Sequence, residues 1–253
     1  MTTPWLRCYQ PRPDARLRLV CFPHAGSGAG AFRGWPQLLP PWIELLAVQY
    51  PGREDRFTEP LLTDLTALAE AVLPEVAAFA SLAGRPLALF GHSMGAAIAH
   101  EVALRLPDPA HLIVSAREPV EHVSAGEVHL GDDAALRAEL ARLGGTSRLL
   151  FEDAELWQLM APVIRADYRL IETYRPPPGR LLSCPVTAFA ALADTELTLG
   201  QAGDWAHATT GGFTLRTFPG DHFYLVPQRH QVAAAIADCL LTPTTLLPEA
   251  CSP

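Results

Sequence analysis

The segment that most restricts the fold is a serine between two glycines, placed where an apolar stretch gives way to a helical pattern. Residues 87–106 read LALFGHSMGAAIAHEVALRL, with a strand-like start and a helix-favouring continuation. Glycines around a serine let the chain turn sharply from strand to helix, which strains the serine and exposes its hydroxyl. A plain glycine-rich turn would explain the two glycines, but not their position between strand and helix. We therefore predict that Ser93 is a nucleophile.

Short β-prone stretches alternate with helix-length stretches along most of the chain. Strands that are apolar on both faces and separated by helices are typical of a parallel sheet covered on both sides. The sequence therefore predicts an α/β fold with a mostly parallel central sheet. The expected strands are 17–22, 44–50, 87–90, 111–115, 185–191 and 213–218, and the expected helices are 65–83, 94–106 and 228–241.

One connection between expected strands is far longer than a parallel crossover needs. Residues 116–184 span 69 residues, whereas about a dozen suffice for a crossover. Two stretches within it have the spacing of amphipathic helices. Their apolar positions are Leu136, Leu140 and Leu143, followed by Leu156, Leu159, Met160, Val163, Ile164 and Ile171. We predict a single domain over residues 1–253 with a helical lid inserted at about 117–184; the alternative is a covering helix plus a surface excursion.

All 19 basic residues are arginine, and the chain contains neither lysine nor asparagine. Schiff-base enzymes, P-loop NTPases, protein kinases and Ser-Lys hydrolases each require a lysine at a defined position. Asparagine is required for N-glycosylation and for a Cys-His-Asn triad. These classes are therefore excluded, which leaves chemistry by serine, histidine, carboxylates and backbone donors.

Charge and apolar patterning indicate the partners and the compartment. The formal net charge is −8, and the sequence lacks the basic stripe of a nucleic-acid-binding surface. Its apolar stretches are interrupted before the roughly 18 residues that span a bilayer, and its first residues lack the pattern of a signal peptide. Five scattered cysteines without a CxxC pair argue against a disulfide framework or a zinc site. We expect a cytoplasmic protein with reduced thiols, no metal and no cofactor, which binds neither nucleic acid nor membrane.

A nucleophilic serine needs a histidine base, and the base needs a carboxylate to orient it. In hydrolases with this turn, the acid and then the histidine follow the serine along the chain. His222 lies just after the last expected strand, where a loop can bring it over Ser93, and Asp194 follows the preceding strand. Asp221 adjoins His222, and neighbouring side chains diverge. Glu118, which follows an earlier strand, remains the alternative acid.

The other histidines near these elements have structural explanations. His100 falls two turns after Ser93 on the expected helix and is predicted to be packed. His207 and His230 are predicted to lie on helix surfaces. His24 is predicted to pack or hydrogen-bond within its loop and not to act as a second base.

The oxyanion that forms when a serine attacks a carbonyl requires backbone N–H donors. One donor is expected from Met94, directly after the nucleophile, and the other from the loop after an earlier strand. That loop lies in CFPHAGSGAGAF, with Ala25 as the expected donor. Its glycines are not spaced G-x-G-x-x-G, and no acidic residue ends a strand about 20 residues later, so dinucleotide binding is not indicated.

Several stretches of the chain occur together, in the same order, in one known family. They are CFPHAGSGAGAF, VQYPGREDRFTEP, FGHSMGAAIAHEVA, LGGTS, RADYRLIETYRPPP, CPVTAFAALADTE and FPGDHFYL. Between about residue 17 and residue 226 the chain resembles the type II thioesterases of polyketide and nonribosomal peptide assembly lines. QYPGRE-x-R together with GHSMGA separates these from generic esterases and lipases. Two departures are Ser27, where the family usually has a glycine, and Ala191-Leu192-Ala193, where the family has a glycine-rich approach to the acid.

The resemblance implies an α/β-hydrolase fold with Ser93, Asp194 and His222 as the triad, Ala25 and Met94 as oxyanion donors, and a mobile lid. It implies a thioester hydrolase that acts through an acyl-enzyme on the phosphopantetheine arm of acyl or peptidyl carrier proteins. The implied role, in antibiotic-type biosynthesis, is the removal of aberrant or stalled acyl groups.

Two other functions stay open from the sequence, and so does the docking surface. An acyltransferase of the same fold would pass the acyl group from Ser93 to an alcohol or amine, and a binding or scaffold protein would use no chemistry. Because the chain is itself acidic, overall attraction cannot drive docking of an acidic carrier protein, but a local arginine patch could. The alternative is that the candidate arginines form a solvated face or structural pairs, with Arg53 in particular a buried structural arginine. The candidates are Arg53 and Arg56 in the PGREDR loop and Arg137, Arg142 and Arg148 in the lid.

Overall fold

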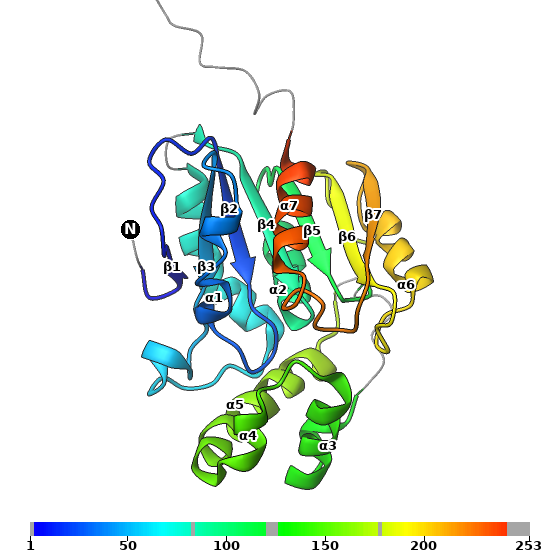
Figure 1. Ribbon diagram of the computed structural model, residues 1–253. Helices are drawn as coiled ribbons and strands as arrows, with labels where there is room; N and C mark the ends of the chain where they lie inside the picture. Colours follow the sequence, from blue (N-terminus) through cyan, green and yellow to red (C-terminus); the bar gives the residue numbers. More distant parts are fainter. Residues whose placement is uncertain (1–2, 82–83, 120–125, 177–178, 242–253) are drawn as a thin grey trace, which may run out of the picture.

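A single central sheet organises the chain (Figure 1). The computed structural model describes residues 3–81, 84–119, 126–176 and 179–241. Its seven strands lie in the order β1-β3-β2-β4-β5-β6-β7, and every neighbouring pair is parallel except β1 with β3. The predicted α/β fold with a mostly parallel sheet is confirmed. The strands are β1 (Leu6–Arg7), β2 (Leu17–Phe22), β3 (Ile43–Val48), β4 (Leu87–His92), β5 (His111–Ser115), β6 (Val186–Ala191) and β7 (Phe213–Phe218).

Both faces of the sheet are buried, because consecutive residues of a strand point to opposite sides. Leu46 of β3 belongs to the core formed with α1 (Leu65–Ser81) and α2 (Met94–Ala103). Its neighbour Leu45 belongs to the opposite core, formed with α7 (Arg229–Leu240). Every residue of β2, β3, β4 and β6 is buried, which explains their nearly unbroken apolar sequences.

The observed bounds follow the predicted ones closely, with two informative differences. The predicted strands 17–22, 111–115 and 213–218 have the observed bounds. Strand β1 was not predicted, because two residues are too few to show alternation. Helix α2 ends at Ala103 and not at the predicted position 106, since the residue before Pro107 is disfavoured in helical conformation. The shorter helices are η1 (Ala29–Phe32), η2 (Pro36–Leu38), η3 (Glu54–Arg56), η6 (Val128–Leu130), α6 (Leu199–Gly203) and η7 (Asp204–Ala208).

The long connection between β5 and β6 forms a helical unit at the carboxyl ends of the parallel strands (Figure 1). The two amphipathic helices predicted there are α3 (Asp133–Leu143) and α5 (Ala154–Thr173). A five-residue helix, α4 (Arg148–Glu152), lies between them and was not predicted. Leu136 and Trp157 belong to a small separate core of this unit. The unit thus has its own packing, beyond that of one covering helix.

No helix of the described ranges is both long and apolar enough to cross a bilayer. The longest, α5, instead presents one mainly apolar side, with Trp157 and Ile164 buried, and one mainly polar side, with Gln158 and Arg169 exposed. Leu159, predicted among its apolar positions, lies exposed on the second side. This pattern suits a helix that packs on a protein core and faces water on the other side.

The buried histidine His100 gives the fold a testable pH dependence. As predicted, its ring is packed: it lies in α2, is 3% exposed and contacts Trp205 edge-on at 5.1 Å. Neither ring nitrogen has a hydrogen-bond partner among the described residues. Burial therefore lowers the pKa of His100 to about 4. The unfolded chain has the ordinary pKa of about 6.5 and binds the proton first, so protonation favours unfolding as the pH falls from about 6.5 to 4.

We predict that His100→Leu weakens the loss of stability between pH 7 and pH 5. The missing contribution is about 2 kcal/mol of unfolding free energy, measured by urea denaturation at the two pH values. His207→Leu is the matched control, because His207 lies exposed in η7. An unchanged pH dependence in His100→Leu would contradict the assignment.

Candidate active site

Ser93 occupies the turn between β4 and α2 in a backbone conformation that a non-glycine residue seldom adopts. Its φ is 53° and its ψ is −119°, outside the regions open to most side chains. The flanking glycines make this turn possible. A Cβ at Gly95 would collide with the carbonyl oxygens of Phe22 and Pro23, and a Cβ at Gly91 with the backbone of Gly95. The local sequence therefore positions the Ser93 hydroxyl above the carboxyl ends of the strands.

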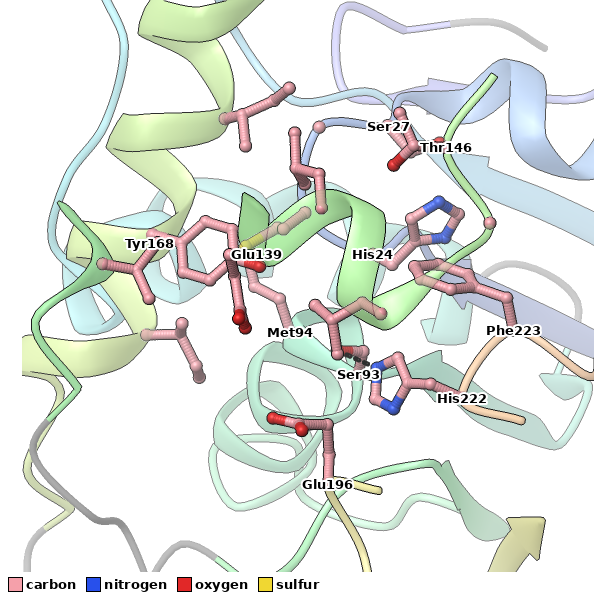
Figure 2. A pocket seen from close by; sticks show the side chains of 18 of the residues that line it. His24, Ser27, Ser93, Met94, Glu139, Thr146, Tyr168, Glu196, His222 and Phe223 are labelled. Carbon is pink, nitrogen blue, oxygen red and sulfur yellow. Dashed lines mark hydrogen bonds between the residues drawn. The ribbon is translucent and has the colours of Figure 1, made fainter. Parts of the chain in front are cut away.

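Two further predicted residues lie in line with Ser93. The Nε2 atom of His222 is 3.0 Å from the Ser93 Oγ, as Figure 2 shows by its dashed line. The Nδ1 atom of His222 is 3.0 Å from Oδ2 and 3.2 Å from Oδ1 of Asp194. The His222 side chain is 6% exposed and the Asp194 carboxylate is fully buried. Asp194 follows β6 and His222 follows β7, so the sheet brings both to the edge where Ser93 lies.

The alternative acids make different contacts. Glu118 lies 3.4 Å from the guanidinium of Arg117. Asp221 accepts a hydrogen bond of 3.0 Å from the backbone N–H of Phe223 and so caps the turn that carries His222. The structure therefore brings Asp194, and not these two carboxylates, to the histidine ring.

The two expected oxyanion donors face the same cavity as Ser93 and His222. Met94 is the first residue of α2, where a backbone N–H has no acceptor one turn earlier. Ala25 lies in the loop after β2, and among the residues that the structure describes its N–H has no acceptor. Both residues line the cavity beside Ser93. A negative oxygen there would also meet the positive end of the α2 dipole.

A group of polar side chains under His222 was not predicted from the sequence. The Nδ1 atom of His92 is 2.8 Å from Ser115 Oγ, which is 2.6 Å from the hydroxyl of Tyr224. The ring centroids of His92 and His222 are 5.5 Å apart. Burial, and then the nearby His222, keep the pKa of His92 well below its ordinary value. His92 is therefore uncharged near neutral pH and adds no positive charge beside His222.

His24 packs in its loop, as predicted. Its ring meets Phe223 edge-on at 5.1 Å and His92 at 5.8 Å. Burial, and then His222, lower the pKa of His24 to about 4. Its ring is uncharged near neutral pH, which fits a wall residue better than a second base.

The cavity over Ser93 has a volume of about 630 Å³ and is lined on its far side by the helical unit. Apolar side chains of α3 and α5, among them Leu140, Met160 and Ile164, line it. Tyr168, Glu139 and Glu196 add polar groups to the wall (Figure 2). The two carboxylates are bridged by Arg142, at 2.7 Å from Glu139 and 2.6 Å from Glu196.

Most of the arginines suggested for docking are engaged within the protein. Arg53 and Arg56 are 4% and 8% exposed and pair with Asp167 and Glu59, so for these two arginines the alternative of structural pairs holds. Arg137 lies 3.7 Å above the ring of Trp157. By contrast, the Arg148 side chain is 89% exposed and pairs across the helix surface with Glu152.

Comparisons of the sequence and of the structure with known proteins all find thioesterases. A family model described as a thioesterase domain matches residues 17–240. The thioesterase PikA5 of Streptomyces venezuelae is 41% identical over 242 residues, which covers 94% of this chain and 85% of PikA5. The solved structure of the type II thioesterase BorB, from the borrelidin biosynthetic cluster, has a TM-score of 0.87 at 42% identity, over 95% of this chain and 99% of BorB. YbtT, a type II thioesterase from the yersiniabactin NRPS/PKS pathway, has a TM-score of 0.84 at 30% identity, over 96% of this chain and 100% of YbtT.

We predict that Asp194→Asn lowers kcat for a small acyl thioester by about three to four orders of magnitude, because the amide no longer holds the His222 ring in the right tautomer. Steady-state thiol release, followed with a thiol-reactive dye, measures the effect. Glu118→Gln is the matched control and should leave kcat unchanged. If Glu118→Gln showed the large loss and Asp194→Asn did not, the acid would be misassigned.

Proposed function

The chain belongs to the thioesterase family, together with type II thioesterases of polyketide and nonribosomal peptide pathways. On that premise we propose that it removes aberrant or stalled acyl groups from a biosynthetic assembly line. It is a thioester hydrolase of the serine class. The proposed substrate is an acyl group carried on the phosphopantetheine arm of an acyl or peptidyl carrier protein, and the proposed product is the free acid. We also propose that the protein is cytoplasmic. The segment at about 117–184, which contains α3, α4 and α5, is proposed to be the lid of a single domain.

One observation carries the mechanism: the continuous hydrogen-bond line from Asp194 through His222 to Ser93, with 3.0 Å between Nε2 and Oγ. In the first half-reaction the Ser93 Oγ bonds to the thioester carbonyl carbon while its proton moves to His222 Nε2. Asp194 holds the ring and stabilises the imidazolium. The carbonyl oxygen becomes an oxyanion, which the N–H groups of Met94 and Ala25 bind. The C–S bond then breaks and leaves an acyl group on Ser93.

The leaving group favours the thioester over an ester. A thiol has a pKa of about 8.5 and therefore needs less help from an acid than an alkoxide does. His222 gives the proton that it took from Ser93 to the departing sulfur. In the second half-reaction a water loses a proton to His222 and attacks the acyl carbonyl, and the Ser93 oxygen recovers the proton when the acid leaves.

The cavity limits the acyl group. Its volume of about 630 Å³ lies within the range of about 300–1,000 Å³ of small-molecule sites. Apolar walls from Leu140, Met160 and Ile164 suit a small or medium acyl chain. Selection among acyl thioesters then depends on whether the acyl group fits below the α3–α5 unit more than on how strongly His222 protonates the leaving thiol.

We predict that Ser93→Ala abolishes release of acetyl or propionyl groups from a loaded carrier protein, with a loss of at least about a thousandfold. Intact-protein mass spectrometry of the carrier protein follows the reaction. Equal deacylation by wild type and variant would refute the mechanism. The same assay with added alcohols or amines distinguishes transfer, since an acyltransferase would yield the ester or amide in place of the free acid.

We also predict that Arg148→Glu weakens recognition of the carrier protein. Arg148 and the half-exposed Leu149 follow Ser147, which lines the cavity, so they lie at its rim. Reversing a rim charge should raise KM for the acyl carrier protein about 3- to 10-fold and leave KM for the matching N-acetylcysteamine thioester unchanged. Arg16→Glu is the matched control, because Arg16 is exposed just before β2, at the opposite edge of the sheet. Equal effects on both substrates would exclude a docking role.

A further inference from the structure

A buried ion pair joins the helical unit to the loop that carries Ala25. The Arg53 guanidinium lies 2.6 Å and 2.9 Å from the two carboxylate oxygens of Asp167 on α5. Their side chains are 5% and 2% exposed. The desolvation of two charges is offset only when the geometry is good and the remaining polar atoms also find partners. The place where those partners lie indicates what this pair does.

Both members of the pair also bind the backbone just after Ala25. The Gly26 N–H donates to Asp167 Oδ2 at 2.7 Å. The Arg53 Nη1 atom donates to the Ser27 carbonyl at 3.2 Å. Gly26 has a φ of +75°, and a Cβ there would lie 3.0 Å from Ile164 of α5, so the loop and α5 are in close contact.

The same loop is held on its other sides by side chains. Gln49 accepts a hydrogen bond from the Ala29 N–H at 2.9 Å, and Glu54 accepts one from the Gly30 N–H at 2.9 Å. The Tyr50 hydroxyl donates to the Pro23 carbonyl at 3.1 Å. The peptide that carries the Ala25 N–H therefore lies between a peptide held by Tyr50 and a peptide held by Asp167. Within the described residues, the Ala25 N–H is left for the cavity.

We propose that Arg53 and Asp167 are positioning residues for the oxyanion hole. Asp167 holds the peptide between Ala25 and Gly26, Arg53 holds both Asp167 and the Ser27 carbonyl, and together they aim the Ala25 N–H at the oxygen that becomes negative. This proposal rests on the proposed function, in which the Ala25 N–H binds the oxyanion. Preorganised donors act because they need no rearrangement at the moment of reaction.

The test compares Asp167→Asn with wild type on a propionyl N-acetylcysteamine thioester. Loss of one oxyanion donor lowers kcat about 100- to 1,000-fold in other hydrolases, and a misaligned donor should lower kcat about 10- to 100-fold here with KM unchanged. Affinity for a trifluoromethyl ketone, which forms a tetrahedral adduct with the serine, should fall by the same factor. Affinity for the thioether analogue of the substrate, which has no reactive carbonyl, should not change.

A second variant tests whether the loss of kcat persists when the fold is preserved, and a control tests whether loss of any buried ion pair lowers kcat. The double variant Arg53→Met, Asp167→Leu replaces the pair by apolar side chains, which often preserves stability, but still removes the acceptor for Gly26; it should show the same loss of kcat. Glu44→Gln is the matched control: Glu44 forms a similarly shielded pair with Arg18 at 3.3 Å, near the amino end of the sheet. It should lower the thermal midpoint without lowering kcat.

Three results would overturn the proposal. They are an unchanged kcat both in folded Asp167→Asn and in the folded double variant, which has no acceptor for Gly26, a rise in KM alone, and an equal loss of kcat in Glu44→Gln. Failure of the proposed function would look different, since wild type itself would then release no thiol from the thioester.

Discussion

The close approach of α2 to the central sheet is the constraint on which the site depends. Gly91 and Gly95 allow main chain to lie against main chain, with the first residues of α2 next to the carbonyls that end β2. Only at that distance can the chain pass from strand to helix within one residue. Ser93, the residue at this turn, takes the resulting strain, which persists because packed structure surrounds it on both sides.

The parallel sheet turns this local constraint into a site. Crossover connections return the chain to the same end of each strand, so the loops after β2, β4, β6 and β7 all open on one edge. Ala25, Ser93, Asp194 and His222 come from these four loops, far apart in sequence. The helical unit covers that edge and supplies the outer wall of the cavity. Sites at the carboxyl ends of parallel strands are general in open α/β sheets.

Much of this arrangement was predictable because it has local signals. Apolar runs gave three of the strands with their observed bounds, the glycines around Ser93 marked the turn, and chain order suggested Asp194 and His222. Helix α4 escaped prediction because five residues show no periodicity. Glu118 remained an alternative, since the choice between two carboxylates depends on the paths of loops and not on spacing.

The fate of Arg53 shows why the remaining features could not be predicted. Its sequence context, PGREDR, is polar, and a buried structural arginine was one interpretation of it, but the sequence does not indicate the partner. The guanidinium pairs with Asp167, which lies on a helix 114 residues later in the chain. The contact between His92 and Ser115, from neighbouring strands, is equally non-local. Both depend on tertiary packing, for which a single sequence contains no local pattern.

Helix α5 contacts both the acyl-chain space and the loop after β2, so a displacement of the helix changes both contacts. Met160 and Ile164 face the space for the acyl chain, and Asp167, one turn after Ile164, holds the Gly26 N–H. A rigid helix cannot change one of these contacts without the other. An acyl chain too large for the cavity would push on α5 and draw Asp167 away from the loop, so that poor fit would slow turnover even after binding. Discrimination between acyl groups would then arise in the rate of the reaction step, and a long acyl chain would slow its own hydrolysis.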